Sequence, residues 1–208
     1  MFVLVPFIFG FNSTSCLDDV IVKKSGVLPD NVLNNTCVKR LIFDQCSFRT
    51  APERLNELRS LESLVFKDCG LLNDLPRLDS LINLKELRLS LSRINKIPSA
   101  IFGLKKLEIL DVSKTKIDSV SPDIKKLTSL KKLALNNLKI KNLPSSIVYL
   151  KDLEILWIAN TNLKELPLEI FTLKKLKVVW ADWGEMRDGY KYKKRFLEIN
   201  PAMKFQLK

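Results

Sequence analysis

The side chains that perform most enzymatic and metal chemistry are missing from this sequence or scattered through it. Its 208 residues contain no histidine, which removes the usual general base and the commonest metal ligand. Carboxylates such as Asp111 and Asp182 have no acidic partner at the spacing of a catalytic pair. We therefore expect a protein that is not an enzyme and that holds no cofactor and no metal.

One stretch has the glycine spacing of a phosphate-binding loop. In GEMRDGYK, residues 184–191, Gly184 and Gly189 are correctly separated. The second glycine should be followed by lysine and then serine or threonine, but Tyr190 and Lys191 occupy these positions. Because the lysine that would reach a phosphate is absent, we predict no nucleotide site here.

The positive charge is concentrated in the second half of the chain. Residues 101–208 carry 22 basic and 12 acidic side chains, whereas residues 1–100 carry 13 and 11. Lysine pairs recur at 105–106, 125–126, 131–132 and 174–175. They indicate either a solvated outer face that keeps the protein soluble or a surface for an anionic partner, such as nucleic acid or acidic lipid.

A repeat of 23 residues organises the chain. Leucine recurs at positions 61, 84, 107, 130, 153 and 176, and each leucine opens the apolar pattern LxxLxLxxxxIxxIPxxIxxLxx. Counting back to Val38 gives six copies over residues 38–175. The alternation in LEILWIA predicts a strand, and the segment after the proline predicts a short helix or turn. Since one copy cannot bury its own apolar face, we expect stacked copies to share a continuous core.

Two copies depart from this pattern. In the second copy Leu72, Leu75 and Pro76 are each displaced by one residue, which predicts a local bulge. In the fourth copy the proline, Pro122, comes one residue late.

The repeat resembles the leucine-rich repeat family over two thirds of the chain. Its length and proline are similar to those of intracellular Ras-binding scaffolds and the Scribble/Erbin class. NTNLKELP and SKTKIDSV, with Thr161 and Thr115 where many repeats have asparagine, are also similar to plant disease-resistance receptors. The resemblance implies an α/β solenoid: a curved stack with a parallel β-sheet on its concave side and short helices or turns on its convex side. It also implies that the concave sheet binds proteins.

Such a stack exposes its core at both ends, so each end needs a cap. We predict an N-terminal cap over residues 16–37. Residues 176–208 are predicted to form a last partial repeat and a C-terminal cap. There YKYKKRFLEI has aromatic and aliphatic residues at helical spacing, Pro201 ends the helix, and AMKFQLK alternates as an edge strand does.

The register of the repeats predicts which strand residues face solvent. The central row of the concave sheet reads Ile42, Val65, Arg88, Asp111, Ala134, Trp157 and Trp180. Exposed aromatic residues with apolar neighbours are typical of surfaces that anchor a partner protein. The predicted partner-binding residues are Trp157, Trp180, Trp183, Ile155, Asp182, Asn160, Asp111 and Arg88. The alternative for Trp180 and Trp183 is burial beneath the C-terminal cap.

All four cysteines lie in the first 69 residues. Cys46 and Cys69 are one repeat apart, at a position where the family has asparagine or cysteine, and we expect them to be buried free thiols. Cys16 and Cys37 flank the N-terminal cap. A disulfide between Cys16 and Cys37 is a hypothesis that requires an oxidising compartment.

The N-terminal residues bear on that compartment. Residues 2–11 are apolar over the length of a signal-peptide core, and Ser13 and Ser15 fit a cleavage pattern, although no lysine or arginine precedes them. Asn34 begins a glycosylation sequon. We predict a signal peptide at residues 1–15 and a secreted protein. The alternative is a cytoplasmic protein whose apolar N-terminal segment lies over the first repeat.

These observations favour a single-domain, monomeric protein–protein interaction scaffold that uses its concave face. The rival hypothesis is an electrostatic adaptor that binds nucleic acid or acidic lipid through the lysine-rich C-terminal half. A third is a structural spacer without a specific ligand. Binding that weakens steeply with salt would favour the adaptor.

Overall fold

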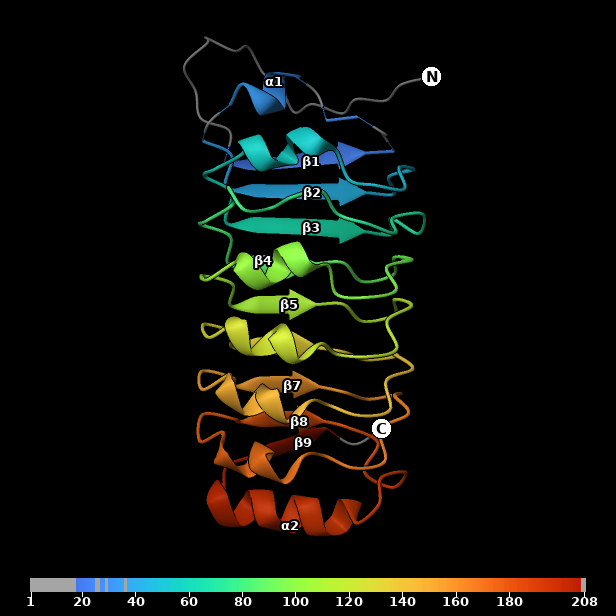
Figure 1. The fold of residues 1–208 in the computed structure, drawn as a ribbon, viewed down its shortest axis with the longest axis vertical. Coiled ribbons are helices and arrows are strands. Elements are labelled where there is room, and N and C mark those ends of the chain that lie inside the picture. The colour runs from blue at the N-terminus through green and yellow to red at the C-terminus, as the bar shows by residue number, and fades with distance from the viewer. Residues whose placement is uncertain (1–17, 25–26, 29, 36, 207–208) are drawn as a thin grey trace.

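The computed structural model describes residues 18–24, 27–28, 30–35 and 37–206. Its strands form one parallel nine-stranded sheet in which spatial order equals sequence order, and the coils stack into an elongated solenoid (Figure 1). The strands are β1 (Asp19–Lys23), β2 (Arg40–Asp44), β3 (Ser63–Lys67), β4 (Glu86–Arg88), β5 (Ile109–Asp111), β6 (Lys132–Ala134), β7 (Ile155–Trp157), β8 (Val178–Trp180) and β9 (Lys204–Gln206). The predicted solenoid with a parallel concave sheet is confirmed.

The repeat register fixes the core. Equivalent residues of neighbouring repeats pair with each other, for example Leu110 with Leu133 and Leu133 with Leu156. These leucines are fully buried, because alternation along a strand directs every second side chain inward. At the N-terminal end, Phe43 and Phe66 stack with ring centroids 5.1 Å apart. The inward residues therefore form one core that runs the length of the stack.

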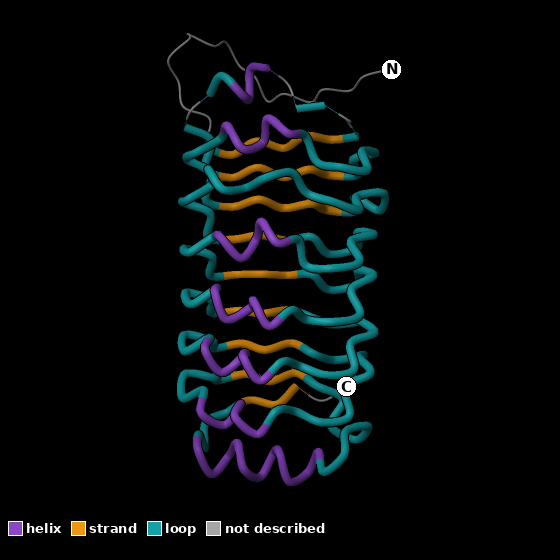
Figure 2. Tube along the Cα trace, in the orientation of Figure 1, coloured by secondary structure: helices purple, strands orange, loops and turns teal. Residues whose placement is uncertain are grey.

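The convex side consists mainly of short 3-10 helices, which Figure 2 shows on the side opposite the strands. They are η1 (Glu53–Glu57), η2 (Ser99–Gly103), η3 (Pro122–Lys126), η4 (Ser145–Tyr149) and η5 (Leu168–Thr172). In most of them the repeat proline has an extended conformation just before the helix, and its carbonyl accepts the first i+3 hydrogen bond. An example is the bond from the Ile101 N–H to the Pro98 carbonyl, 3.0 Å. Proline suits this position because its missing N–H would have no partner in the helix.

The two irregular copies have local explanations. In the fourth copy Ser121 takes the capping position, where its hydroxyl accepts a hydrogen bond from the Asp123 N–H at 3.2 Å. Pro122 then becomes the first residue of η3, a position that proline favours. In the second copy no helix forms, and Asp74 instead makes an isolated parallel bridge with Thr50.

In most repeats the turn after the strand contains a residue with a left-handed backbone conformation. It recurs at Gln45, Asp68, Leu91, Lys114, Asn137 and Asn160, with φ between 52° and 63°. Asparagine tolerates this conformation, whereas a side chain such as leucine pays a steric penalty in it. The turn therefore stores strain at Leu91, where φ is 63°.

We expect Leu91→Asn to raise the free energy of unfolding by about 0.5–1 kcal/mol, since Leu91 is 44% exposed and its loss removes little packing. Urea denaturation would measure the change. The reverse substitution two repeats later, Asn137→Leu, should lower stability by a similar amount. Equal stabilities for wild type and both variants would show that the turn is not strained.

Both ends of the stack carry additional elements. At the N-terminal end, β1 pairs with β2 and is followed by the one-turn helix α1 (Asp30–Leu33). At the C-terminal end, α2 (Gly189–Ile199) follows β8, and the chain then returns as β9 to pair with β8 in parallel. Figure 1 shows α2 lying across the end of the solenoid.

Candidate partner-binding site

Trp157 and Trp180 lie side by side on the concave sheet. Pairing of β7 with β8 places the two tryptophans opposite each other and places Ile155 opposite Val178. The two rings meet edge to face, with centroids 5.7 Å apart and an interplanar angle of 82°, an arrangement that aromatic pairs favour. All four side chains are half-buried. We call Ile155, Trp157, Val178 and Trp180 the aromatic patch.

Lys132 of β6 borders the aromatic patch. It pairs in register with Ile155, and its ammonium lies 3.4 Å from the centroid of the Trp157 ring. Burial of the ammonium, together with the charge of Arg88, lowers the pKa of Lys132 below its usual value. Within the described part of the chain, no carboxylate lies within ion-pair distance of Lys132.

Arg88 and Asp111 belong to a charged network in the middle of the concave face. The Arg88 guanidinium donates to Glu86 at 2.6 Å and lies 3.7 Å from a carboxylate oxygen of Asp111. Ser63 donates to the other oxygen of Glu86 at 2.6 Å. Burial opposes the ionised form of Glu86, but these hydrogen bonds outweigh it and lower its pKa. Ala134 separates this network from Trp157 in the central row, so the two predicted groups form separate sites.

Asp182 and Asn160 hold the backbone. The Asp182 carboxylate accepts a hydrogen bond from the Asn160 N–H in the neighbouring turn. Two repeats before Asp182, at the equivalent position, the Asn136 side chain accepts from the Ala159 N–H at 2.9 Å. Asp182 therefore continues a row of polar side chains that bind the backbone between successive coils.

The structure corrects the prediction that Trp183 contacts a partner, because this residue is buried. Only 6% of its side chain is exposed, and its ring packs against Phe205 and Phe196, with centroids 5.4 and 6.2 Å away. Its six counterparts in earlier repeats are exposed and left-handed, but Trp183 does not share their conformation. The chain turns towards the core after β8, and the cap covers this side chain, as the alternative for Trp183 anticipated.

Sequence reasoning missed Lys132 and Glu86. Both lie two residues before the central row, a position that faces solvent on the same side of the strand. Extending the register by two residues would have found them. The ring contact of Lys132 depends on its side-chain conformation, which the register does not specify.

The cysteines form two groups. Cys46 and Cys69 are buried free thiols whose sulfur atoms donate to the carbonyls of Val22 and Phe43, each at 3.5 Å. Cys37 is disulfide-bonded. Its predicted partner, Cys16, lies outside the described residues, so the pairing stays a prediction.

The predicted modification and targeting signals are untested. Asn34 is exposed directly after α1, in agreement with its being accessible, but glycosylation remains a prediction. Residues 1–15, the predicted signal peptide, lie outside the described residues. In the described part of the chain, no helix is long and apolar enough to cross a membrane. Among the same residues, cysteine and carboxylate side chains form no cluster of three or more that could hold a metal ion.

Many lysines outside the sheet face are paired. Just before the N-terminal ends of successive strands, one position of the repeat alternates between lysine and glutamate from Lys39 to Lys177. Ion pairs link successive coils there, at 2.7 Å for Lys85–Glu62, 2.9 Å for Lys131–Glu108 and 2.7 Å for Lys177–Glu154. Among the lysine pairs, Lys126 contacts Asp123 at 3.0 Å and Lys175 contacts Asp152 at 2.6 Å. These contacts agree with a solvated surface on which ion pairs neutralise part of the lysine charge.

Comparison with known proteins identifies the class to which this fold and surface belong. One family model, described as a leucine-rich repeat region, matches residues 121–192, and another, described as a leucine rich repeat, matches residues 82–137. Together they span more than half of the sequence. The chain belongs to the leucine-rich repeat family.

Solved structures share the fold at low sequence identity. A leucine-rich repeat protein of Leptospira interrogans is 24% identical, with a TM-score of 0.57, over 86% of this chain and 57% of its own. Internalin C2 of Listeria monocytogenes is 20% identical, with a TM-score of 0.65, over 73% of this chain and 64% of its own. This chain therefore spans less than two thirds of either protein.

A third similar structure contains a bound factor. The ectodomain of the plant membrane receptor kinase GASSHO1/SCHENGEN3 from Arabidopsis thaliana, in complex with CASPARIAN STRIP INTEGRITY FACTOR 2, is 22% identical with a TM-score of 0.56. The match covers 78% of this chain and 24% of the ectodomain. Among curated proteins, no sequence matches this chain.

Proposed function

We propose that this protein is a non-catalytic interaction module that binds a partner protein through the aromatic patch on its concave sheet. Proteins of the leucine-rich repeat family are generally protein-interaction modules. The observation that carries the proposal is the tryptophan pair: Trp157 and Trp180 are half-exposed at equivalent positions of adjacent strands. Tryptophan is the residue type most enriched among the energetic centres of protein interfaces.

The core does not require these two rings. Leu156 and Val179, their neighbours on the same strands, point inward and are fully buried. The indoles instead leave apolar surface on a face that helices do not cover. A partner that buried this surface would gain hydrophobic free energy, whereas the free protein leaves it in water. The proposal takes the protein to be a monomer with this patch accessible.

Affinity capture with the Trp157→Ala variant tests the proposal. We expect the variant to lose at least about 2 kcal/mol of binding free energy, a roughly thirtyfold loss of affinity, as central interface tryptophans do. Its free energy of unfolding should fall by only about 1 kcal/mol, because the edge-to-face contact with Trp180 is its main aromatic contact.

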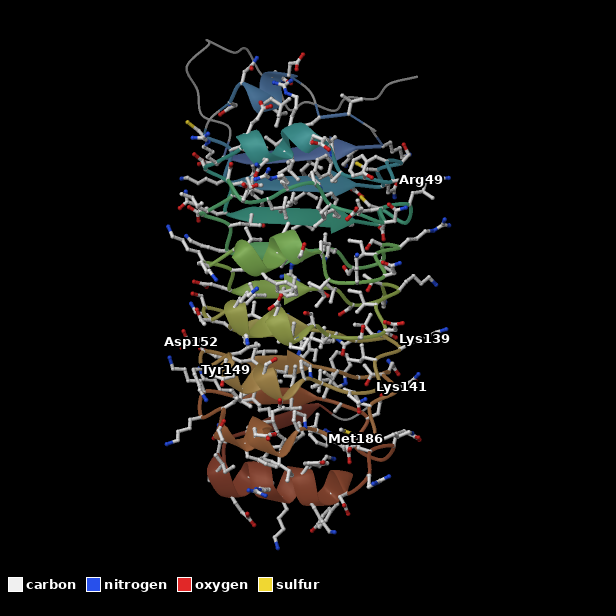
Figure 3. All side chains as sticks on the ribbon, in the orientation of Figure 1. Arg49, Lys139, Lys141, Tyr149, Asp152 and Met186 are labelled. Carbon is white, nitrogen blue, oxygen red and sulfur yellow. The ribbon has the colours of Figure 1, made fainter. Side chains whose placement is uncertain are left out.

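Tyr149→Ala is the matched control. Tyr149 is an aromatic residue with 58% exposure on the convex helix η4 (Figure 3), so its removal tests aromatic surface on the wrong face. Partners retained by wild type and Tyr149→Ala but lost by Trp157→Ala would support the concave site. Equal retention by both variants, or unfolding of Trp157→Ala, would contradict it.

One observation favours electrostatic binding as a second candidate function. Arg93, Lys116 and Lys139 stand at the same position of three successive repeats, and no described carboxylate lies within ion-pair distance of them. Figure 3 shows Lys139 at the edge of the solenoid opposite that of Asp152. The capture experiment repeated at high salt separates the two candidates. Binding through this column should fade with salt, whereas binding through the tryptophan pair should largely persist.

A further inference from the structure

The row of concave residues next to the tryptophans begins and ends with a lysine. Across strands β6 to β9 it reads Lys132, Ile155, Val178 and Lys204. Two cations thus border two apolar side chains, and the tryptophan pair lies immediately beside the apolar ones. Strands are about 4.8 Å apart, so the lysine backbones are separated by about 14 Å.

Lys132 is half-buried beside the Trp157 ring and has no described carboxylate within ion-pair distance. The Trp157 ring contacts its ammonium, but a ring face does not accept the three hydrogen bonds that an ammonium can donate. The nearby carboxylates serve other groups, since Glu86 is bound by Arg88 and Ser63, and Asp111 accepts from the Ser113 N–H at 3.0 Å. Lys132 is therefore a half-buried cation beside an apolar surface, and no described carboxylate pairs with it.

This environment differs from that of its neighbour in the sequence. Lys131 points to the edge of the sheet and forms an ion pair with Glu108 at 2.9 Å, which raises the pKa of Lys131. Burial has the opposite effect on Lys132. The two lysines carry the same formal charge, but of the two only Lys132 lies beside the aromatic patch, and it has no described carboxylate within ion-pair distance.

An acidic residue, Asp182, lies on the other side of the tryptophan pair and disfavours an acidic ligand there. Asp182 follows Trp180 by two residues and keeps a negative charge on that side, where it accepts from the Asn160 N–H. An acidic ligand would be repelled there and attracted to the row of Lys132 and Lys204. Lys204 is exposed and has no described carboxylate within ion-pair distance.

We propose that the partner presents an extended acidic peptide segment whose apolar side chains cover the aromatic patch and whose carboxylates pair with Lys132 and Lys204. An extended chain advances about 3.3 Å per residue, so carboxylates about four residues apart would span the two lysines. The segment would cross strands β6 to β9. This inference rests on the proposed function and adds the chemistry of the ligand.

The test begins with a displayed library of random 12-residue linear peptides selected on the wild-type protein. One enriched peptide is then synthesised with a fluorophore, and its anisotropy is measured during titration with wild type, Trp157→Ala, Lys132→Met, Lys204→Met and Lys131→Met. Lys131→Met is the matched control, because it removes the same charge from the edge of the sheet. A second form of the peptide, with glutamine and asparagine in place of its acidic residues, tests the contact without altering the protein.

We expect enriched peptides to place acidic residues at either end of an apolar segment. Lys132→Met and Lys204→Met should each weaken binding about tenfold, as loss of one charge-assisted hydrogen bond does, and the neutral peptide, which loses both pairs, should weaken it about a hundredfold. Lys131→Met should bind as wild type does, and Trp157→Ala should bind at least about thirtyfold more weakly.

Two results would overturn the inference. Peptides that require Trp157 but show no acidic enrichment, or that bind wild type and Lys132→Met equally, would refute the acidic ligand and leave the concave binding site intact. An absence of any enriched peptide that depends on Trp157 would refute the extended peptide ligand, and the affinity capture with Trp157→Ala would decide the concave binding site separately.

Discussion

Replacing Phe196 with alanine is expected to lower the free energy of unfolding by about 3–5 kcal/mol, the usual cost of truncating a buried phenylalanine. Phe196 lies at the centre of the aromatic cluster that forms the C-terminal cap. Only 2% of its side chain is exposed, and its ring lies 4.7 Å from Phe171, 6.2 Å from Trp183 and 6.2 Å from Phe205, measured between centroids. It thus joins α2 to the last 3-10 helix, the turn after β8 and the edge strand.

The loss should also change the association state of the protein. A solenoid exposes the apolar end of its stack when a cap fails, and the exposed end promotes aggregation. We expect Phe196→Ala to show a lower urea midpoint and more aggregate in size-exclusion chromatography, and deletion of residues 187–208 to aggregate more severely still.

Leu197→Ala is the matched control, because Leu197 is the next residue of α2 and is 42% exposed. Its stability should stay close to that of wild type. If Phe196→Ala were as stable and as monomeric as Leu197→Ala, α2 would not be the element that closes the core.

The second large effect is expected at Gly189. A Cβ atom at this position would lie 1.9 Å from the carbonyl oxygen of Trp183 and 2.9 Å from its carbonyl carbon. Because the obstacle is backbone, no side-chain rotation can relieve the contact. We expect Gly189→Ala to destabilise the protein by about 3 kcal/mol, at the upper end of the usual range for overpacking, and to displace the start of α2.

Gly184→Ala supplies the control within the same loop, since a Cβ atom there meets nothing within 4 Å. Urea denaturation followed by tryptophan fluorescence would compare the two variants. Similar stabilities would show that the backbone moves apart at little cost. Gly189 permits close packing of the cap on Trp183, which accounts for this glycine of GEMRDGYK without a phosphate.

The sequence was sufficient to place Trp157 beside Trp180. A constant repeat length brings equivalent residues of successive coils into register, and alternation along each strand then decides which side chains face outward. The same reasoning placed Arg88 and Asp111 in the central row. It did not reveal that these two residues belong to a closed network with Glu86 and Ser63.

The register failed at Trp183 because the repeat ends there. The position is one repeat after Asn160, but the chain does not form the left-handed turn that exposes the earlier residues. Its burial depends on Phe196 and Phe205, which come 13 and 22 residues later in the chain. A contact of this kind arises only when the helix and the edge strand have packed on the end of the stack.

The 23-residue period and the strand alternation by themselves determined the solenoid, its inward leucines and the row that contains the tryptophan pair, since each depends only on spacing along the chain. The tertiary structure decided which aromatic residues remain on the surface and left Lys132 and Lys204 without a described carboxylate within ion-pair distance. Packing of α2 buried Trp183 and left Trp157 and Trp180 half-exposed. The carboxylates nearest to Lys132, those of Glu86 and Asp111, are bound by other groups. The sequence does not show this, because such contacts join residues that only folding brings together.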